Sequence, residues 1–261
     1  MYSVLEELTA RFKGVVAELG EPNYRINSFA SKGPIVVAWR NGPPWIVVDL
    51  KTEGYPSRRF VGKYLLTGGN WRHPEDKTPL DLYRRELGDE LGALVSGLSP
   101  VIEPFADYLE VHSVEQHGNP NMRKVLPETR GTIYCIASVF SSTLEGEELQ
   151  EVFGIPTTEL NPESLRGRIK STESGVAVLT VEGLLSGDIN NFAAGDGIRL
   201  KDYLRERYGI KISVRTPHGK SIRLTQTTPL TPYAERDSLP YLRLNPLRVG
   251  TAPQQSPFRK V

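Results

Sequence analysis

Residues 78–94 constrain the fold of this chain more than any other segment, because their pattern specifies a helix with two distinct faces. Thr78 is a favourable N-cap residue, and Pro79 suits the first helical position. At about 100° per residue, one face carries apolar side chains suited to packing on a sheet, namely Leu80, Tyr83, Leu87, Leu91 and Leu94. A separate face, about 100° wide, carries three acids, Glu86, Asp89 and Glu90. The segment therefore predicts a helix that lies on a sheet and presents carboxylates beside it.

The rest of the chain alternates between strand and helix patterns. Clusters of β-branched and aromatic residues predict strands at 35–39, 45–50, 60–66, 101–114, 132–141 and 176–181. Apolar spacing predicts helices at 2–19 and 198–207, which end at Gly20 and Gly209. This mixture predicts an α/β fold with a mixed sheet and helices on its faces. With 261 residues, we expect one core at 30–210, an N-terminal helical extension at 1–29 and a C-terminal extension at 211–261.

Several classes of protein are excluded by what the sequence contains. No apolar run approaches the roughly 18 residues of a membrane span, so we expect no contact with a membrane. Glu6 and Glu7 lie where a secretory signal would carry basic residues, and we therefore expect a cytoplasmic protein. The single cysteine, Cys135, lies in an apolar run and is interpreted as a buried strand thiol and not a nucleophile.

The C-terminal extension is basic and rich in proline. Residues 211–261 contain nine Lys and Arg residues against two acids, together with seven prolines, which disfavour helices and interior strands. We interpret it as a strand or two followed by a solvated tail that wraps the body. A second interpretation is an electrostatic arm for nucleic acid or a phosphorylated ligand.

The acidic face of the 78–94 helix needs a counter-charge, because carboxylates at this spacing repel one another. A hard divalent ion such as Mg²⁺ would supply it, since Mg²⁺ prefers oxygen ligands and is completed by water or phosphate oxygens. Arg85 would hold the neighbouring Glu86 by a bidentate hydrogen bond. The alternative is an exposed acidic face that Arg84 and Arg85 offset.

The same segment resembles the Nudix box, in which Gly, five residues, Glu and seven residues precede Arg-Glu-aliphatic-x-Glu-Glu-x-Gly-aliphatic. Here Gly69, five residues and Glu75 match the first part, and residues 85–93, RELGDELGA, match the second. Two departures are present within 69–93. Nine residues separate Glu75 from Arg85, which we interpret as a two-residue insertion, Asp76-Lys77, before the helix. Asp89 also stands where the family usually has Glu.

The resemblance implies a Nudix-like α/β/α sandwich and hydrolysis of the pyrophosphate bond in a nucleoside diphosphate linked to another group, with Mg²⁺ or Mn²⁺ as cofactor. By the same resemblance, the metal ligands would be Glu86, Asp89, Glu90 and, more weakly, Glu75. Arg85 would orient Glu86, while Glu86 and Glu90 would be catalytic. Gly68 and Gly69 would bring the loop backbone close to the diphosphate, and Trp71 would either stack on a base or anchor its loop.

The substrate is not specified by this motif. ADP-ribose, dinucleotides and nucleotide sugars all remain open, and dimers are common in proteins resembling this one. A different class of function also remains open, namely a Nudix-fold module that binds or senses a nucleotide without hydrolysing it. Retention of the three helix acids and Arg85 favours the hydrolase, whereas the insertion, Asp89 and the basic C-terminal extension favour the module.

Overall fold

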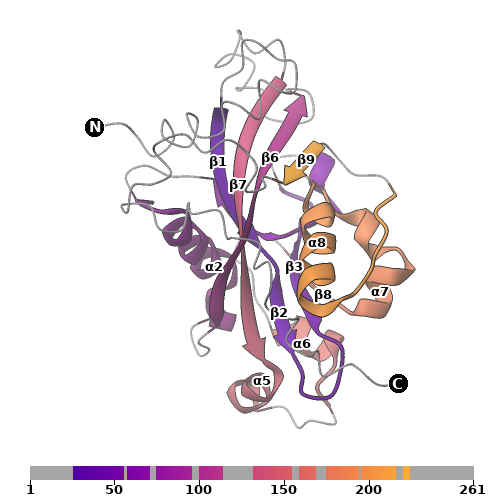
Figure 1. Ribbon diagram of the computed structural model, residues 1–261. Coiled ribbons are helices and arrows are strands. Elements are labelled where there is room, and N and C mark those ends of the chain that lie inside the picture. Colours follow the sequence, from indigo (N-terminus) through magenta and orange to yellow (C-terminus); the bar gives the residue numbers. More distant parts are fainter. Residues whose placement is uncertain are drawn as a thin grey trace, which may run out of the picture.

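The computed structural model describes residues 26–55, 58–70, 75–95, 100–113, 132–154, 159–168, 175–193, 195–215 and 220–223. The expected N-terminal helix and most of the C-terminal extension lie outside these residues. Within them, one mixed sheet crosses the middle of the molecule, with helices on both sides (Figure 1).

The sheet contains nine strands among the described residues, ordered β4-β3-β2-β7-β1-β5, with β6 on β7, β9 on β6 and β8 on β3. The strands are β1 (Ile26–Gly33), β2 (Ile35–Ala38), β3 (Trp45–Leu50), β4 (Tyr64–Leu65), β5 (Thr67–Asn70), β6 (Val101–Ser113), β7 (Thr132–Glu145), β8 (Gly175–Leu179) and β9 (Lys220–Arg223). Strands β1 and β2 run parallel to β7, whereas the other pairs are antiparallel. The sheet is therefore mixed, as predicted.

Strands β1 and β2 lie end to end along the long strand β7, separated by a single residue. Gly33 closes β1, and a Cβ at this position would overlap the carbonyl of Phe140 in β7. The absence of a side chain therefore lets the chain pass close to β7 before β2 resumes the pairing.

Two apolar cores fill the spaces between sheet and helices. Along β2, Ile35 and Val37 belong to one core and Val36 to the other, as the alternation of a strand requires. The first core includes side chains of α2 (Pro79–Val95), α5 (Gly146–Phe153) and α6 (Pro162–Arg168). The second includes side chains of α7 (Val181–Ser186), η3 (Asp188–Asn191) and α8 (Asp196–Tyr208). This confirms the predicted α/β/α sandwich.

Some element predictions were wrong. The segment expected as one strand at 60–66 starts in η1 (Arg58–Phe60), turns at Gly62, where φ is +75°, and forms a strand only at β4. Strand β1 begins at Ile26, four residues before the expected start of the domain. Strand β9 agrees with the expectation of a strand or two in the C-terminal extension, and it pairs with β6. No helix among the described residues is both long and apolar enough to cross a membrane.

Candidate functional site

The acidic helix, α2, is fixed on the sheet by its first turn and its apolar face. The Thr78 hydroxyl caps the helix by accepting a hydrogen bond from the Asp81 N–H at 3.0 Å, as the sequence predicted. The Ser31 hydroxyl on β1 donates to the Pro79 carbonyl at 2.8 Å. Tyr83 is buried and stacks on Phe140 of β7, with ring centroids 5.2 Å apart. These contacts set the rotation of the helix about its axis, and hence which acids face the sheet.

The three helix acids do not share one environment. Glu86 and Glu90, one turn apart, are buried beside the sheet at 6% and 3% exposure. The side chain of Asp89 is 49% exposed at the outer edge of the same face. The structure therefore places Glu86 and Glu90 inside the site and Asp89 at its rim.

Strand β5 approaches α2 with two glycines that the geometry requires. Gly68 has φ of +147°, and a Cβ there would overlap the Ser31 carbonyl on β1. A Cβ on Gly69 would overlap the Glu86 carboxylate. The absence of a side chain at Gly68 therefore lets β5 lie close to β1, and its absence at Gly69 lets Glu86 lie directly on the β5 backbone.

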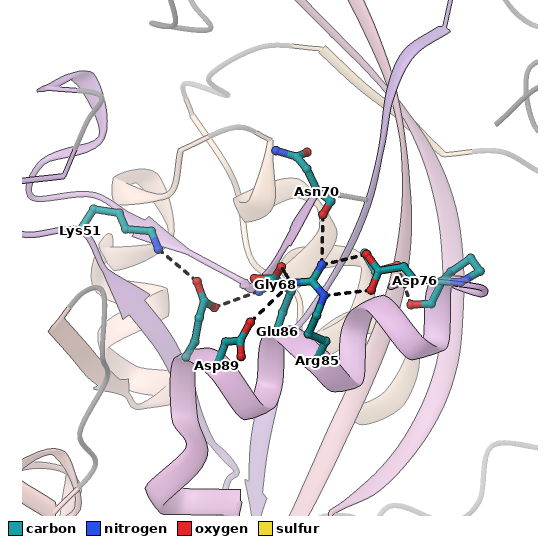
Figure 2. A network of polar contacts seen from close by, with 10 residues as sticks. Lys51, Gly68, Asn70, Asp76, Arg85, Glu86 and Asp89 are labelled. Atoms are coloured by element: carbon teal, nitrogen blue, oxygen red, sulfur yellow. Dashed lines mark hydrogen bonds and ion pairs between the residues drawn. The ribbon is translucent and has the colours of Figure 1, made fainter. Parts of the chain in front are cut away.

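Arg85 connects the loop to the helix (Figure 2). Its Nε and Nη2 donate to the two carboxylate oxygens of Asp76, each at 2.9 Å. Its Nη1 donates to Glu86, and its Nη2 also donates to the Asn70 carbonyl at 3.3 Å. The hydrogen bonds to Asp76, followed by the charge of Glu86, raise the pKa of the Arg85 guanidinium above its ordinary value. Arg85 thus orients Glu86 while its other nitrogens hold the Asp76 carboxylate and the Asn70 carbonyl.

Asp76, in the segment before α2, accepts the hydrogen bonds of Arg85. The sequence predicted that Asp76 belongs to the two-residue insertion, and it indicated no role for this residue. Asp76 is 3% exposed, whereas Glu75, the expected ligand, is exposed. The bidentate geometry of Arg85 selects the acid that the loop turns inward, and spacing along the chain does not reveal which one that is. As predicted, the Asp76-Lys77 pair lies before the helix. Trp71 falls outside the described residues.

A second ion pair network completes the site from β3, and sequence reasoning missed it. Lys51 Nζ lies 3.5 Å from Asp49 Oδ2 and 3.4 Å from Glu90 Oε1, and all three residues are buried. The Gly68 N–H donates to Glu90 Oε2 at 3.2 Å. Burial, and secondly the charge of Asp49, raise the pKa of Glu90 to about 9. The available signal was Asp49 itself, a charge within the otherwise apolar strand Trp45–Leu50.

The Arg85 network and the Lys51 network together contain more acidic than basic side chains. Among the described residues, two cations, Lys51 and Arg85, pair with five acids, which are Asp49, Asp76, Glu86, Asp89 and Glu90. Even with Glu90 protonated, these groups carry two more negative than positive charges, on oxygen ligands of the kind that Mg²⁺ and Mn²⁺ accept. The chemistry of these donors therefore fits a hard divalent cation.

Their present positions differ from those of a loaded metal centre. Among the described residues, no three His, Cys, Asp or Glu side chains are arranged to hold a metal ion. The reason is visible in the contacts: Arg85 draws Glu86 toward Asp76, while Lys51 holds Glu90 toward Asp49. Glu86 and Glu90, with Asp89 at the rim, are the residues that would hold the ion.

Comparison with known proteins gives matches in structure alone. No protein-family model and no curated protein matches the sequence. The NUDIX domain of Shewanella oneidensis NrtR, complexed with ADP ribose, is 12% identical with a TM-score of 0.41, covering 74% of this chain and 97% of that one. A MutT protein from Methanosarcina mazei Go1 is 15% identical with a TM-score of 0.41, covering 71% and 99%.

A second structure of Shewanella oneidensis NrtR is also similar, with 14% identity and a TM-score of 0.40. The match covers 69% of this chain and 63% of that one. The match thus spans less than two thirds of that protein. These matches are Nudix and MutT proteins, the family that the motif at 69–93 resembles.

Proposed function

We propose that this protein hydrolyses the pyrophosphate bond of a nucleoside diphosphate linked to another group, using a divalent metal ion. One observation carries the proposal: two buried carboxylates one helical turn apart, Glu86 and Glu90, lie against the Gly68–Gly69 backbone, with Arg85 fixing the first. That arrangement supports the roles implied by the resemblance of the motif at 69–93 to the Nudix box.

The metal, when bound, supplies neutralisation of the diphosphate charge and a lowered pKa for an attacking water. Glu86, Glu90 and Asp89 would hold it. Arg85 keeps Glu86 in place through the fork to Asp76, so the carboxylate does not have to be ordered when the substrate arrives. The absence of side chains at Gly68 and Gly69 leaves the loop backbone open to close approach by phosphate oxygens.

Glu90 is the residue that we assign to proton transfer. Burial raises its pKa, so Glu90 is a strong base once a bound cation has taken the place of its proton. It also accepts a hydrogen bond from the Gly68 N–H, which aims the carboxylate at the loop. The proton removed from water would therefore pass to Glu90 beside the proposed diphosphate position.

The test is a panel of ADP-ribose, dinucleotides, nucleotide sugars and nucleoside triphosphates, incubated with Mg²⁺ or Mn²⁺. We expect turnover of a nucleoside diphosphate derivative by the wild-type protein and none by Glu90→Gln. Glu163→Gln on α6, with an 80% exposed side chain, is the matched control and should retain full activity. Absence of turnover with every compound and both metals would refute the hydrolase.

A second candidate is a module that binds a nucleotide without hydrolysing it. The observation in its favour is that each of the five acids already forms an ion pair with Lys51 or Arg85, without any added metal. In that case, nucleotide binding would be independent of metal and would persist in Glu90→Gln. The same panel, read by calorimetry in the presence of EDTA, separates the two functions.

A further inference from the structure

Lys51 is the least expected member of the site, because its charge lies where an added cation would be attracted. The side chain is 5% exposed, and its ammonium lies between the Asp49 and Glu90 carboxylates on one side and the ring of Tyr55 on the other, 5.0 Å from the ring centroid. Carboxylates and an aromatic face are both surfaces that attract a cation. The chain thus provides its own positive charge at the inner end of the site.

Only the side chain of Lys51 belongs to this arrangement, since its backbone is held elsewhere. The Lys51 N–H donates to the Lys63 carbonyl at 3.1 Å, and the Gly62 N–H donates to the Lys51 carbonyl at 2.7 Å. Residues 52–54, which follow directly, are exposed. The flexible four-carbon stem can therefore turn toward solvent while the backbone keeps its place in the fold.

The contacts of Lys51 are also weaker than those of Arg85. Its ion pairs are 3.4 and 3.5 Å long, whereas the Arg85 fork holds Asp76 with two hydrogen bonds of 2.9 Å. An ammonium is a single point charge with no fixed fork geometry. Of the two cations in the site, Lys51 is accordingly the one that a stronger cation can replace.

We infer that Lys51 is a tethered counter-cation, which neutralises the Asp49–Glu90 end of the site in the metal-free protein and is displaced when a divalent ion binds there. The inference rests on the proposed function, because it requires a divalent ion at Glu90. It explains how buried carboxylates are tolerated without metal. It also makes metal affinity a property set partly by β3, outside the motif of 69–93.

The first experiment measures Mn²⁺ affinity by calorimetry on the full chain, without nucleotide. We expect Lys51→Met to bind Mn²⁺ about tenfold or more tightly than the wild type, because the competing charge is gone. Lys63→Met is the matched control from the same loop, since Lys63 Nζ bonds Asn191 Oδ1 at 3.0 Å, away from the carboxylates. Its affinity should equal that of the wild type.

Equal affinities in wild type and Lys51→Met would overturn the inference and leave the metal site intact. Absence of Mn²⁺ binding in all three proteins would overturn the proposed function together with it. Because Lys51→Met leaves two buried acids without their cation, a second measurement uses the wild type alone. Acetylation of Lys51 by an anhydride, quantified by mass spectrometry, should rise several-fold on adding Mn²⁺, while that of Lys63 stays constant. Unchanged acetylation of Lys51 would show that the ammonium is not displaced.

Discussion

Two buried ionic clusters lie on opposite faces of the sheet, and they differ in their balance of charge. The cluster beneath α8 contains, within the described part of the chain, two cations and two acids: Lys32, Arg199, Glu110 and Asp196. Arg199 is fully buried and bonds both acids, and the Leu66 N–H donates to Asp196 at 3.0 Å. The cluster beside α2, counted over the residues that the structure describes, has two cations and five acids. A cluster that is neutral by itself needs no ligand, whereas one with a surplus attracts a cation.

The two clusters are neighbours through the sheet. In the β1–β5 register, Lys32 lies opposite Gly68, the glycine whose N–H bonds Glu90. The balanced cluster joins β1, β6 and α8, and β1 in turn pairs with β5 and bonds the first turn of α2 through Ser31. We therefore expect the balanced cluster to stabilise the fold and the unbalanced cluster to bind the metal ion.

The largest effect is expected when one acid is neutralised in each cluster. Glu110→Gln leaves Lys32 and Arg199 with an uncompensated charge, which should lower the free energy of unfolding by about 3–5 kcal/mol. Glu86→Gln reduces the surplus beside α2, so its unfolding free energy should change by less than about 1 kcal/mol while hydrolysis falls by about 10³-fold. Urea unfolding and steady-state kinetics on both variants check this, and the opposite pattern would break the distinction.

A pair of glycines on facing elements separates geometry from stability. Gly69→Ala places a Cβ in the space of the Glu86 carboxylate, and we expect that displacement to lower kcat/KM by about 100-fold. Gly88→Ala, on the exposed side of α2, meets nothing within 4 Å and should stabilise the helix by about 0.5–1 kcal/mol with activity unchanged. Equal kcat/KM values in the two variants would show that activity does not depend on the contact between Glu86 of α2 and the β5 backbone at Gly69.

Two adjacent acids test which residue anchors Arg85. Asp76→Asn removes the charged acceptor of two hydrogen bonds, so we expect the free energy of unfolding to fall by about 1.5–3 kcal/mol and activity to fall with it. Glu75→Gln alters an exposed side chain and should stay within about 0.5 kcal/mol of the wild type. Thermal unfolding at matched pH compares them. A larger loss in Glu75→Gln would reverse the assignment.

The last expected difference is in pH dependence. Because burial and Asp49 raise the pKa of Glu90 from its usual 4.5 to about 9, the folded protein keeps a proton that the unfolded chain loses in this range. The free energy of unfolding in metal-free buffer should therefore fall as pH rises between those two values. Gln cannot ionise, so Glu90→Gln should gain about 1 kcal/mol or more relative to the wild type between pH 5 and 9. Parallel stability curves would exclude the raised pKa.

The sequence predicted the helix of the site because its information is local. The cap at Thr78, the apolar stripe with Tyr83 and the pair Arg85-Glu86 all lie within three turns of one another. The helical wheel also grouped the three acids correctly. It could not rank them, because burial of Glu86 and Glu90 but not Asp89 depends on how the helix is rotated against β1 and β7.

What the sequence did not predict depends on contacts between distant segments. Lys51 and Asp49 reach Glu90 only because β3 and α2 meet on one side of the sheet, some forty residues apart along the chain. Arg85 pairs with Asp76 and not with Glu75 because the chain turns Asp76 inward and leaves Glu75 exposed. Two adjacent acids in a sequence do not show which of them will be buried. In the same way, the partners of Lys32 come from β6 and α8, and nothing near residue 32 identifies them.

Diffraction from crystals soaked in Mn²⁺, with an anomalous difference map at the manganese edge, tests the central claim most directly. The unbalanced cluster predicts a peak about 2.2 Å from carboxylate oxygens of Glu86 and Glu90, beside Gly69. No peak is expected at Glu110 and Asp196, whose charges Lys32 and Arg199 already balance. A peak at that second cluster, or none beside α2, would contradict the assignment of the chemistry to the surplus of negative charge.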